Sequence, residues 1–183
     1  MKYHCTYNSP VGALHLVSDG KALIAATFHR DDSDVADAVL DPSAEPFAEA
    51  RRQLDEYFQG KRKTFELPIN LRGTSFQVRA WKALTEIPFG ETISYKAQAE
   101  RVASVPRAVG LANGQNPIPI IVPCHRVIGA DGSLVGYGGG LDLKRALLQF
   151  EALVNDFGPQ PFPVTKTQAL GSDRRLNFSS SLP

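Results

Sequence analysis

Residues 116–128, Asn-Pro-Ile-Pro-Ile-Ile-Val-Pro-Cys-His-Arg-Val-Ile, place the strongest constraint on how this chain can fold. The prolines lack a backbone N–H and do not fit the interior of a helix. The isoleucines and valines make the segment too apolar for a loop in solvent. We therefore predict buried, extended backbone that ends at Cys124.

Cys124 is followed directly by His125 and Arg126, which is a suggestive setting for a reactive thiol. The nucleophilic form of cysteine is the thiolate, and a nearby base or positive charge increases its population. A carboxylate that orients the imidazole would complete a relay, and Glu151 is the candidate. The residue types alone leave a second interpretation open, because a buried cysteine is often purely structural.

The first 70 residues are predicted to form a small sheet with one helix against it. Short apolar runs over residues 2–7, 12–18 and 22–28 are typical of strands, and Ser-Pro and Asp-Gly turns separate them. Residues 31–41 are acidic and polar and are predicted to be a loop. A helix is predicted from Ser43, with Gly60 as its stop signal. This half contains no obvious catalytic cluster.

From residue 71 the pattern changes to helices. Ser75 is predicted to cap a helix over residues 76–86, and a second helix is predicted over about 94–103. A third begins near Ser104, with Pro106 in its first turn. Two short helices joined by a tight turn have the size of a helix-turn-helix. After a glycine-rich stretch, residues 141–154 are predicted to form a closing helix.

The charge balance excludes a strongly basic or acidic chain. The sequence has 20 Lys+Arg against 19 Asp+Glu, a net charge of +1, so nucleic-acid binding must come from local placement of charge. Residues 1–70 hold 8 basic and 11 acidic side chains, whereas residues 71–157 hold 9 and 7. The basic side chains are therefore concentrated in the second half.

Two cysteines are too few for a disulfide scaffold, which favours a reduced, cytoplasmic setting. The sequence shows no secretory signal and no run of apolar residues long enough to cross a membrane. Metal binding is disfavoured because His4, Cys5, His15 and His29 lack a paired ligand spacing such as Cys-x-x-Cys. We expect no metal, no cofactor and no membrane partner.

Several motifs, in order along the chain, resemble those of the O6-alkylguanine-DNA alkyltransferases. The segment Asn116–Gly129 resembles the active-site motif of that family. The other matching motifs are Gly73-Thr-Ser-Phe-Gln, Trp81-Lys, Ile87-Pro-Phe-Gly-Glu-Thr, Ser94-Tyr95, Arg107-Ala-Val-Gly, Gly136-Tyr-Gly-Gly-Gly and Leu147-Leu-Gln-Phe-Glu151. In the N-terminal half the resemblance is limited to Ser9-Pro-Val-Gly and the general layout.

The resemblance implies an α/β (α+β) fold of two domains. Residues 1–70 would form a supporting sheet domain with a helix. Residues 71–157 would form a helical, winged helix-turn-helix-like domain for DNA binding and alkyl transfer. Residues 158–183, which contain four prolines and few apolar side chains, are predicted to be a disordered tail.

The same resemblance implies DNA repair by direct transfer of an alkyl group, typically methyl, from O6-alkylguanine, and also O4-alkylthymine, to Cys124. His125, linked to the thiol through a water, would relay its proton, Glu151 would orient His125, and Asn116 would brace the active-site turn. A relay is needed because a thiol with an ordinary pKa of about 8.5 is mostly protonated at neutral pH. The protein would act once, since the thioether has no plausible route back to a thiol.

For the substrate pocket, the resemblance implies that Tyr137 lines the guanine site. Gly138 stands where some members of the family carry serine, and its backbone amide can still donate a hydrogen bond. Main-chain carbonyls at Cys124 and Val127 would accept hydrogen bonds from the exocyclic amine of guanine.

The target atom lies inside a duplex, so the base must be flipped out. The resemblance implies that the helix-turn-helix enters the minor groove and that Arg107 fills the space left by the base. Tyr95 would crowd the phosphate, and Ala108 and Gly110 would belong to the same DNA-binding surface. The expected partner is double-stranded DNA carrying alkylated guanine, bound by a monomer.

One departure concerns the turn of this helix-turn-helix. The stretch from Tyr95 to Arg107 is about two residues shorter than the family usually shows, and Val105 and Pro106 replace small residues. This change leaves open a lesion-sensing protein that flips alkylguanine but repairs it poorly, although such sensors lack the acceptor cysteine. A Cys-His hydrolase on another fold is disfavoured because no other part of the chain resembles an acyl-transfer site.

Overall fold

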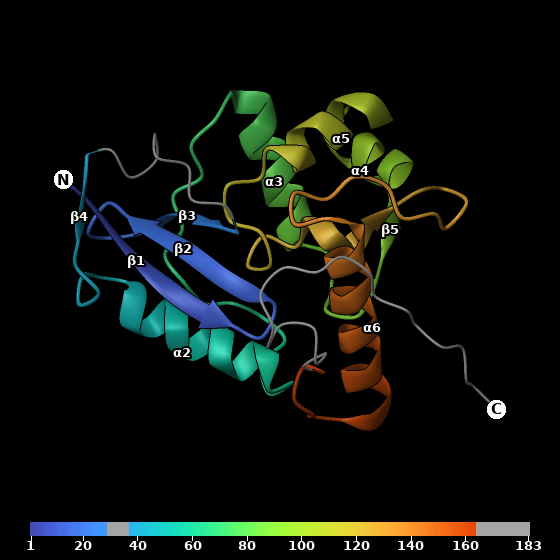
Figure 1. The fold of residues 1–183 in the computed structure, drawn as a ribbon. Coiled ribbons are helices and arrows are strands. Elements are labelled where there is room, and N and C mark those ends of the chain that lie inside the picture. Colours follow the sequence, from blue (N-terminus) through green and yellow to red (C-terminus); the bar gives the residue numbers. More distant parts are fainter. Residues whose placement is uncertain (29–36, 164–183) are drawn as a thin grey trace.

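The computed structural model describes residues 1–28 and 37–163 (Figure 1). The N-terminal half holds a four-stranded sheet in the order β3-β2-β1-β4. Its strands are β1 (Lys2–Ser9), β2 (Gly12–Ser18), β3 (Leu23–Thr27) and β4 (Ala38–Leu40). Neighbouring strands are antiparallel except for β1 and β4, which pair in parallel. The mixed α/β class that was predicted is confirmed.

β4 is a correction to the loop predicted over residues 31–41. Ala38, Val39 and Leu40 pair with the first residues of β1. Three residues are too few for a visible alternation of apolar and polar side chains, so the pattern did not indicate a strand. The rest of the predicted loop up to residue 36 lies outside the described residues.

Helix α2 (Phe47–Phe58) covers one face of the sheet (Figure 1). It begins later than the predicted Ser43, after Pro46. Its buried side includes Phe47, Leu54 and Tyr57, which pack against buried side chains of β1 and β2. Gly60 follows at φ +69, a left-handed conformation that favours glycine at a helix end.

Helix α3 (Ser75–Thr85) begins with a capping box whose N-cap is Thr74 rather than the predicted Ser75. The Thr74 hydroxyl accepts from the Gln77 backbone N–H at 3.2 Å, and the Gln77 side chain accepts from the Thr74 N–H at 2.8 Å. The Thr-x-x-Gln spacing of a capping box distinguishes Thr74 from its neighbour.

Helices α4 (Tyr95–Arg101) and α5 (Pro106–Gly114) form the predicted helix-turn-helix, with Pro106 in the first turn of α5. The buried amides of Gln98 and Asn113 exchange two hydrogen bonds, of 3.0 and 2.7 Å, between the two helices. In the turn between them Ala103 adopts φ +51, an uncommon conformation for a residue with a Cβ. The two helices thus pack as a pair across this tight turn.

The Pro-rich segment is buried as predicted, and Ile118, Ile120 and Val122 are fully covered. It is not extended throughout, because the chain turns at Ile120 (φ +73) and the Val122 N–H bonds back to the Ile118 carbonyl at 2.9 Å. The turn gives the backbone internal hydrogen-bond partners where burial excludes water. It leads into the 3₁₀ turn η1 (Cys124–Arg126).

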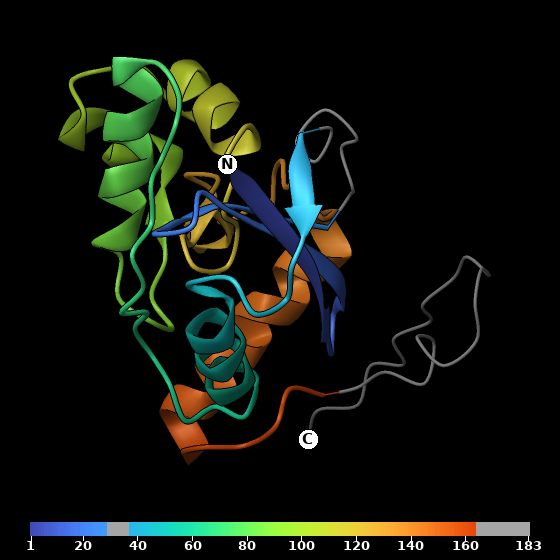
Figure 2. The same ribbon diagram turned by 90° about the vertical axis from the view of Figure 1, so that its left-hand side faces the viewer.

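Two short strands, β5 (Ile93–Ser94) and β6 (Val127–Ile128), pair in parallel beside the helix-turn-helix. Helix α6 (Leu141–Phe157) closes the fold and lies beside α2 (Figure 2). The rings of Tyr57 on α2 and Phe150 on α6 are 5.7 Å apart, so one apolar core joins the two halves.

Disorder was predicted from residue 158 onward, but residues 158–163 pack against the core. The Phe162 ring is buried 5.5 Å from Phe58 and 5.0 Å from Phe150, and its N–H bonds to the Phe58 carbonyl at 2.7 Å. One aromatic side chain among prolines was too weak a signal to predict this contact. Residues 164–183 lie outside the described part. Among the helices of residues 1–28 and 37–163, none has both the length and the apolar character needed to cross a membrane.

Candidate active site

Cys124 begins the short turn η1 and lies at the wall of a cavity of about 230 Å³. The cavity is lined by the predicted Asn116, Tyr137 and Gly138, and also by Phe28 at the end of β3. Both halves of the chain therefore contribute to this cavity. Its size and concave shape suit a small organic group such as a nucleobase.

Burial raises the pKa of the Cys124 thiol to about 11. Hydrogen bonding from the Asn116 side chain and the positive charge of Lys144 act in the opposite direction but do not outweigh burial. The thiol is therefore protonated at neutral pH, and a nucleophilic role requires a group that takes its proton.

Asn116 spans the active-site turn. Its Nδ2 donates to the Val122 carbonyl at 2.8 Å, and its Oδ1 accepts from the Ile118 N–H at 3.0 Å. Through these two hydrogen bonds the Asn116 side chain holds the backbone that leads to Cys124.

His125 and Glu151 are fully buried, and His125 Nε2 lies 2.8 Å from Glu151 Oε1. The carboxylate also accepts from Arg126 Nε and Nη2, both at 2.9 Å, from the Tyr57 hydroxyl at 2.8 Å and from the Gly90 N–H at 2.9 Å. Burial opposes ionisation of Glu151, but the charges and hydrogen bonds of His125 and Arg126 hold its pKa well below the usual range.

The ionised Glu151 decides which ring nitrogen of His125 carries a proton. Because Oε1 can only accept, the proton is on Nε2, and Nδ1 is the acceptor in the neutral ring. Nδ1 is buried and has no hydrogen-bond partner within the described residues. The imidazole of the residue that follows Cys124 thus keeps one buried ring nitrogen without a partner in the described structure.

Tyr137 and the two glycines after it form the wall opposite Cys124. The Tyr137 ring meets the His125 ring edge to face, with centroids 6.4 Å apart, and its hydroxyl is buried without a partner in the described structure. A Cβ at Gly138 would meet nothing within 4 Å, whereas one at Gly139 would lie 2.7 Å from Leu143.

Val127 is buried in β6, and its side chain does not line the cavity. Its backbone N–H donates to the Cys124 carbonyl. The expectation that main-chain carbonyls at Cys124 and Val127 read guanine stays a prediction.

The DNA-binding candidates lie on or against α5. Arg107 is exposed and has no hydrogen-bond or ion-pair partner within the described residues. Ala108 and Gly110 are half-buried, and a Cβ at Gly110 would lie 3.7 Å from the Tyr95 ring. The Tyr95 hydroxyl donates to the Val135 carbonyl at 2.8 Å, so this tyrosine connects α4 to the loop that leads to the cavity.

A family model described as "6-O-methylguanine DNA methyltransferase, DNA binding domain" matches residues 75–153, and a second, described as "6-O-methylguanine DNA methyltransferase, ribonuclease-like domain", matches residues 2–71. The chain belongs to the 6-O-methylguanine DNA methyltransferase family. The methylated-DNA–protein-cysteine methyltransferase of Mycobacterium tuberculosis is 47% identical over 153 residues, which cover 82% of this chain and 93% of the relative. The enzyme of the same name from Methanosarcina acetivorans is 45% identical over 81% of this chain and 97% of its own.

Solved structures of the family have the same fold. The O6-methylguanine methyltransferase of M. tuberculosis superposes with a TM-score of 0.77 at 47% identity, over 83% of this chain and 93% of the other. The M. tuberculosis protein in complex with DNA gives a TM-score of 0.77 at 48% identity, over 82% of this chain and 92% of the other.

Four residues of this methyltransferase site carry contacts that were not predicted from the sequence. Arg126 adjoins His125, so its position next to the reactive pair was the available signal. Lys144 is buried on α6 and donates to the Val135 carbonyl at 2.8 Å and the Gly136 carbonyl at 3.3 Å. Tyr57 and Phe28 come from the N-terminal half, and no sequence motif connects them to Cys124.

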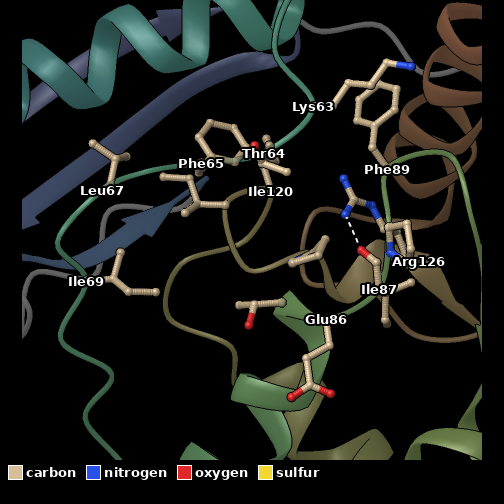
Figure 3. Close-up of a pocket in the computed structure, with 14 residues that line it drawn as sticks. Lys63, Thr64, Phe65, Leu67, Ile69, Glu86, Ile87, Phe89, Ile120 and Arg126 are labelled. Carbon is tan, nitrogen blue, oxygen red and sulfur yellow. Dashed lines mark hydrogen bonds between the residues drawn. The ribbon is translucent and has the colours of Figure 1, made fainter.

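The methyltransferase chain has a second cavity, of about 310 Å³, on another side of the active-site segment (Figure 3). Lys63, Phe89 and Arg126 lie at one end of it, and apolar side chains of residues 65–69 lie at the other. The Arg126 guanidinium donates to the Ile87 carbonyl at 2.7 Å, drawn as a dashed line. Cys124 lines the first of these two cavities and not the second.

Proposed function

We propose that this chain repairs double-stranded DNA by moving the alkyl group, typically methyl, of O6-alkylguanine onto its own Cys124. The observation that carries the proposal is a cysteine at the wall of a nucleobase-sized cavity, next to a buried His125–Glu151 pair, in a member of this family. The proposed substrates include O4-alkylthymine, which presents an alkyl group on an equivalent exocyclic oxygen.

The reaction is one in-line displacement. The Cys124 sulfur forms a bond to the alkyl carbon while the bond from that carbon to O6 breaks, and the electron pair of the broken bond remains on the base. The thiol proton passes through a water to Nδ1 of His125. The guanine anion then takes up one proton and the imidazolium returns its own to the surrounding water, so that overall the thiol proton replaces the alkyl group on the base. Glu151 stabilises the imidazolium formed in between. The thioether is not reversed, so each molecule acts once, and the reaction uses no cofactor and no metal.

The raised pKa of Cys124 fits this order of events. A thiol with a pKa of about 11 holds little thiolate in the resting protein, so the sulfur becomes nucleophilic only as the relay removes its proton. Asn116 keeps the turn in place while the proton leaves.

In the proposed complex the base is flipped out of the duplex into the cavity against Tyr137 and the Gly138 amide, with carbonyls of Cys124 and Val127 reading its exocyclic amine. Arg107 enters the stack from α5, and Tyr95 crowds the phosphate. Ala108 and Gly110 let the backbone of α5 approach the minor groove closely.

We further propose that residues 1–70 and 71–157 act as a supporting and a reacting domain, and that the protein works as a monomer in the cytoplasm. The near-neutral net charge of +1 is consistent with few phosphate contacts and a shallow dependence of DNA affinity on salt.

The test is an intact-mass measurement after incubation with a duplex oligonucleotide carrying O6-methylguanine. We expect the protein to gain one methyl group on the peptide that contains Cys124. Cys124→Ser should abolish the gain, and Cys5→Ser, which changes the other buried cysteine, should keep it. A protein that binds the duplex but stays unmodified would contradict transfer and support a lesion sensor.

A further inference from the structure

The Glu151 carboxylate is shared between the two halves of the molecule. Its Oε1 accepts from the Tyr57 hydroxyl at 2.8 Å, and the same oxygen accepts from His125 Nε2 at 2.8 Å. Tyr57 belongs to α2, the helix of the N-terminal sheet, whereas Glu151 belongs to α6. A single oxygen thus connects the supporting half to the residue that takes the proton of Cys124.

We propose that Tyr57 is a positioning residue for alkyl transfer, which acts through Glu151 on His125 and makes α2 part of the active site. The inference rests on the proposed function. Tyr57 touches neither Cys124 nor the cavity, so its effect passes entirely through the carboxylate.

The hydrogen bonds around Glu151 explain why one hydroxyl matters. A carboxylate has about four lone-pair positions, and here five contacts from protein groups use them. Three of these contacts, from Tyr57, Arg126 and His125, converge on Oε1. Each donor withdraws electron density from the oxygen, so Tyr57 limits how strongly Glu151 holds the proton of His125. It also fixes the carboxylate plane in the direction of the imidazole.

The position of Tyr57 is itself fixed by aromatic packing. Its ring is fully buried and packs edge to face against three phenylalanine rings. The distances between ring centroids are 5.2 Å to Phe58, 5.9 Å to Phe89 and 5.7 Å to Phe150. Burial, together with the negative charge of Glu151, raises the pKa of the Tyr57 hydroxyl well above its usual value. Tyr57 therefore keeps its hydroxyl proton and remains a donor around neutral pH.

Other titratable groups face the relay from each element around it. Arg126 and His125 lie on η1, and Tyr137 lies on the loop before α6. Cys124 lines the cavity, and the charge of Lys144 on α6 acts on its thiol. These groups all belong to the second half of the chain, whereas Tyr57 comes from the N-terminal half. A substitution at Tyr57 therefore tests the link between the two halves and leaves the other titratable groups in place.

Tyr57→Phe removes the hydroxyl and keeps the buried ring. The matched control is Tyr7→Phe, because the Tyr7 hydroxyl donates to Asp55 of the same helix at 2.7 Å, away from the relay. The measurement is the single-turnover rate of methyl transfer from an O6-methylguanine duplex across pH 5 to 9, with urea unfolding of each variant alongside.

We expect Tyr57→Phe to react about tenfold more slowly at neutral pH, because the carboxylate loses one of its fixed donors. The acid side of its rate profile should move to higher pH by about half a unit, because the freer Oε1 accepts more strongly from Nε2–H and so stabilises the imidazolium that forms when Nδ1 takes a proton. Tyr7→Phe should keep the wild-type profile. A Tyr57→Phe profile that matches the wild type, or one that falls by the same factor at every pH with no shift of its acid side, would overturn the proposal.

A second variant keeps the test decisive if Tyr57→Phe unfolds. Incorporation of 3-fluorotyrosine at position 57 retains the hydroxyl and makes it a stronger donor, so the acid side should move to lower pH with the rate preserved. No movement would overturn the positioning role. The wild-type protein in the same assay separates the two proposals, because failure of transfer there contradicts the proposed function itself.

Discussion

The buried surroundings of Glu151, the proposed relay, and helix α5, the proposed recognition helix, use polar side chains in opposite ways. Both carboxylate oxygens of Glu151 accept hydrogen bonds from protein donors. The side chains of His125, Arg126 and Glu151 are all buried. On α5, Arg107 is exposed and has no partner within the described residues. A buried charge loses its hydration and must be paired within the folded protein. An exposed cation stays hydrated and remains available to bind an external anion.

Because of this difference, substitutions in the two regions should have different effects on the transfer rate and on the free energy of unfolding. A change in the relay alters chemistry and stability together, because the same hydrogen bonds serve both. A change on α5 alters the reaction with duplex DNA and leaves the fold intact.

The largest effect is expected from removing the base. In His125→Asn the thiol loses its proton acceptor, and the transfer rate at pH 7 should fall by about 10²- to 10⁴-fold. Because the pKa of Cys124 is raised to about 11, the residual rate should rise about tenfold per pH unit from neutral pH toward that value. The control His15→Asn, on β2, should keep the wild-type rate, and a residual rate that is flat with pH would contradict the relay.

The next effect is on stability. Glu151→Gln leaves the Arg126 guanidinium buried without its counter-charge, which should lower the free energy of unfolding by about 3–5 kcal/mol in urea titrations. Glu49→Gln, which breaks an exposed pair with Arg52, should have a much smaller effect on the free energy of unfolding, because solvent screens that pair.

The sign of the pH dependence follows from the depressed pKa of Glu151. The ionised Glu151 carboxylate contributes its full stabilisation of the fold above the ordinary carboxyl pKa of 4.5. This contribution is lost as the pH falls through the lower pKa that Glu151 has in the folded protein. The difference between wild type and Glu151→Gln should therefore shrink in acid. A difference that is constant with pH would show that the charge of Glu151 is not what stabilises the fold.

The recognition helix should show the opposite behaviour. Arg107→Ala should slow repair of duplex DNA by about thirtyfold, since the gap left by the flipped base is no longer filled, yet react normally with free O6-benzylguanine. Its free energy of unfolding should stay within about 0.5 kcal/mol of the wild type. Arg145→Ala removes the same charge from α6 and serves as the control. Equal losses on both substrates would exclude the flipping role.

The helices and the buried position of Cys124 could be predicted because local signals specify them. Apolar spacing and caps define α3 to α6 within a few residues, and Cys124, His125 and Arg126 are neighbours in sequence. Glu151 could be named as the candidate carboxylate, but its contact with His125 could not be derived from the sequence, since periodicity cannot say which face of α6 meets η1. Tyr57 and Phe28 reach the site through packing of the two halves, which no local pattern encodes. The same holds for Phe162, whose burial depends on the space between Phe58 and Phe150.

The smallest effect is expected at the cavity wall, where two neighbouring glycines differ in what surrounds them. Gly138→Ala adds a methyl group into open space, so the transfer rate should change by less than about twofold. Gly139→Ala places its Cβ 3.0 Å from the Tyr137 ring and 3.2 Å from Phe28, which must shift and reshape the wall. We expect it to slow transfer by about fivefold, and more for benzyl than for methyl groups, because the larger group needs the space that the shifted rings take. Rates measured by mass with both substrates would check this order. A larger loss at Gly138 than at Gly139 would mean that the reacting base lies against a different part of the wall.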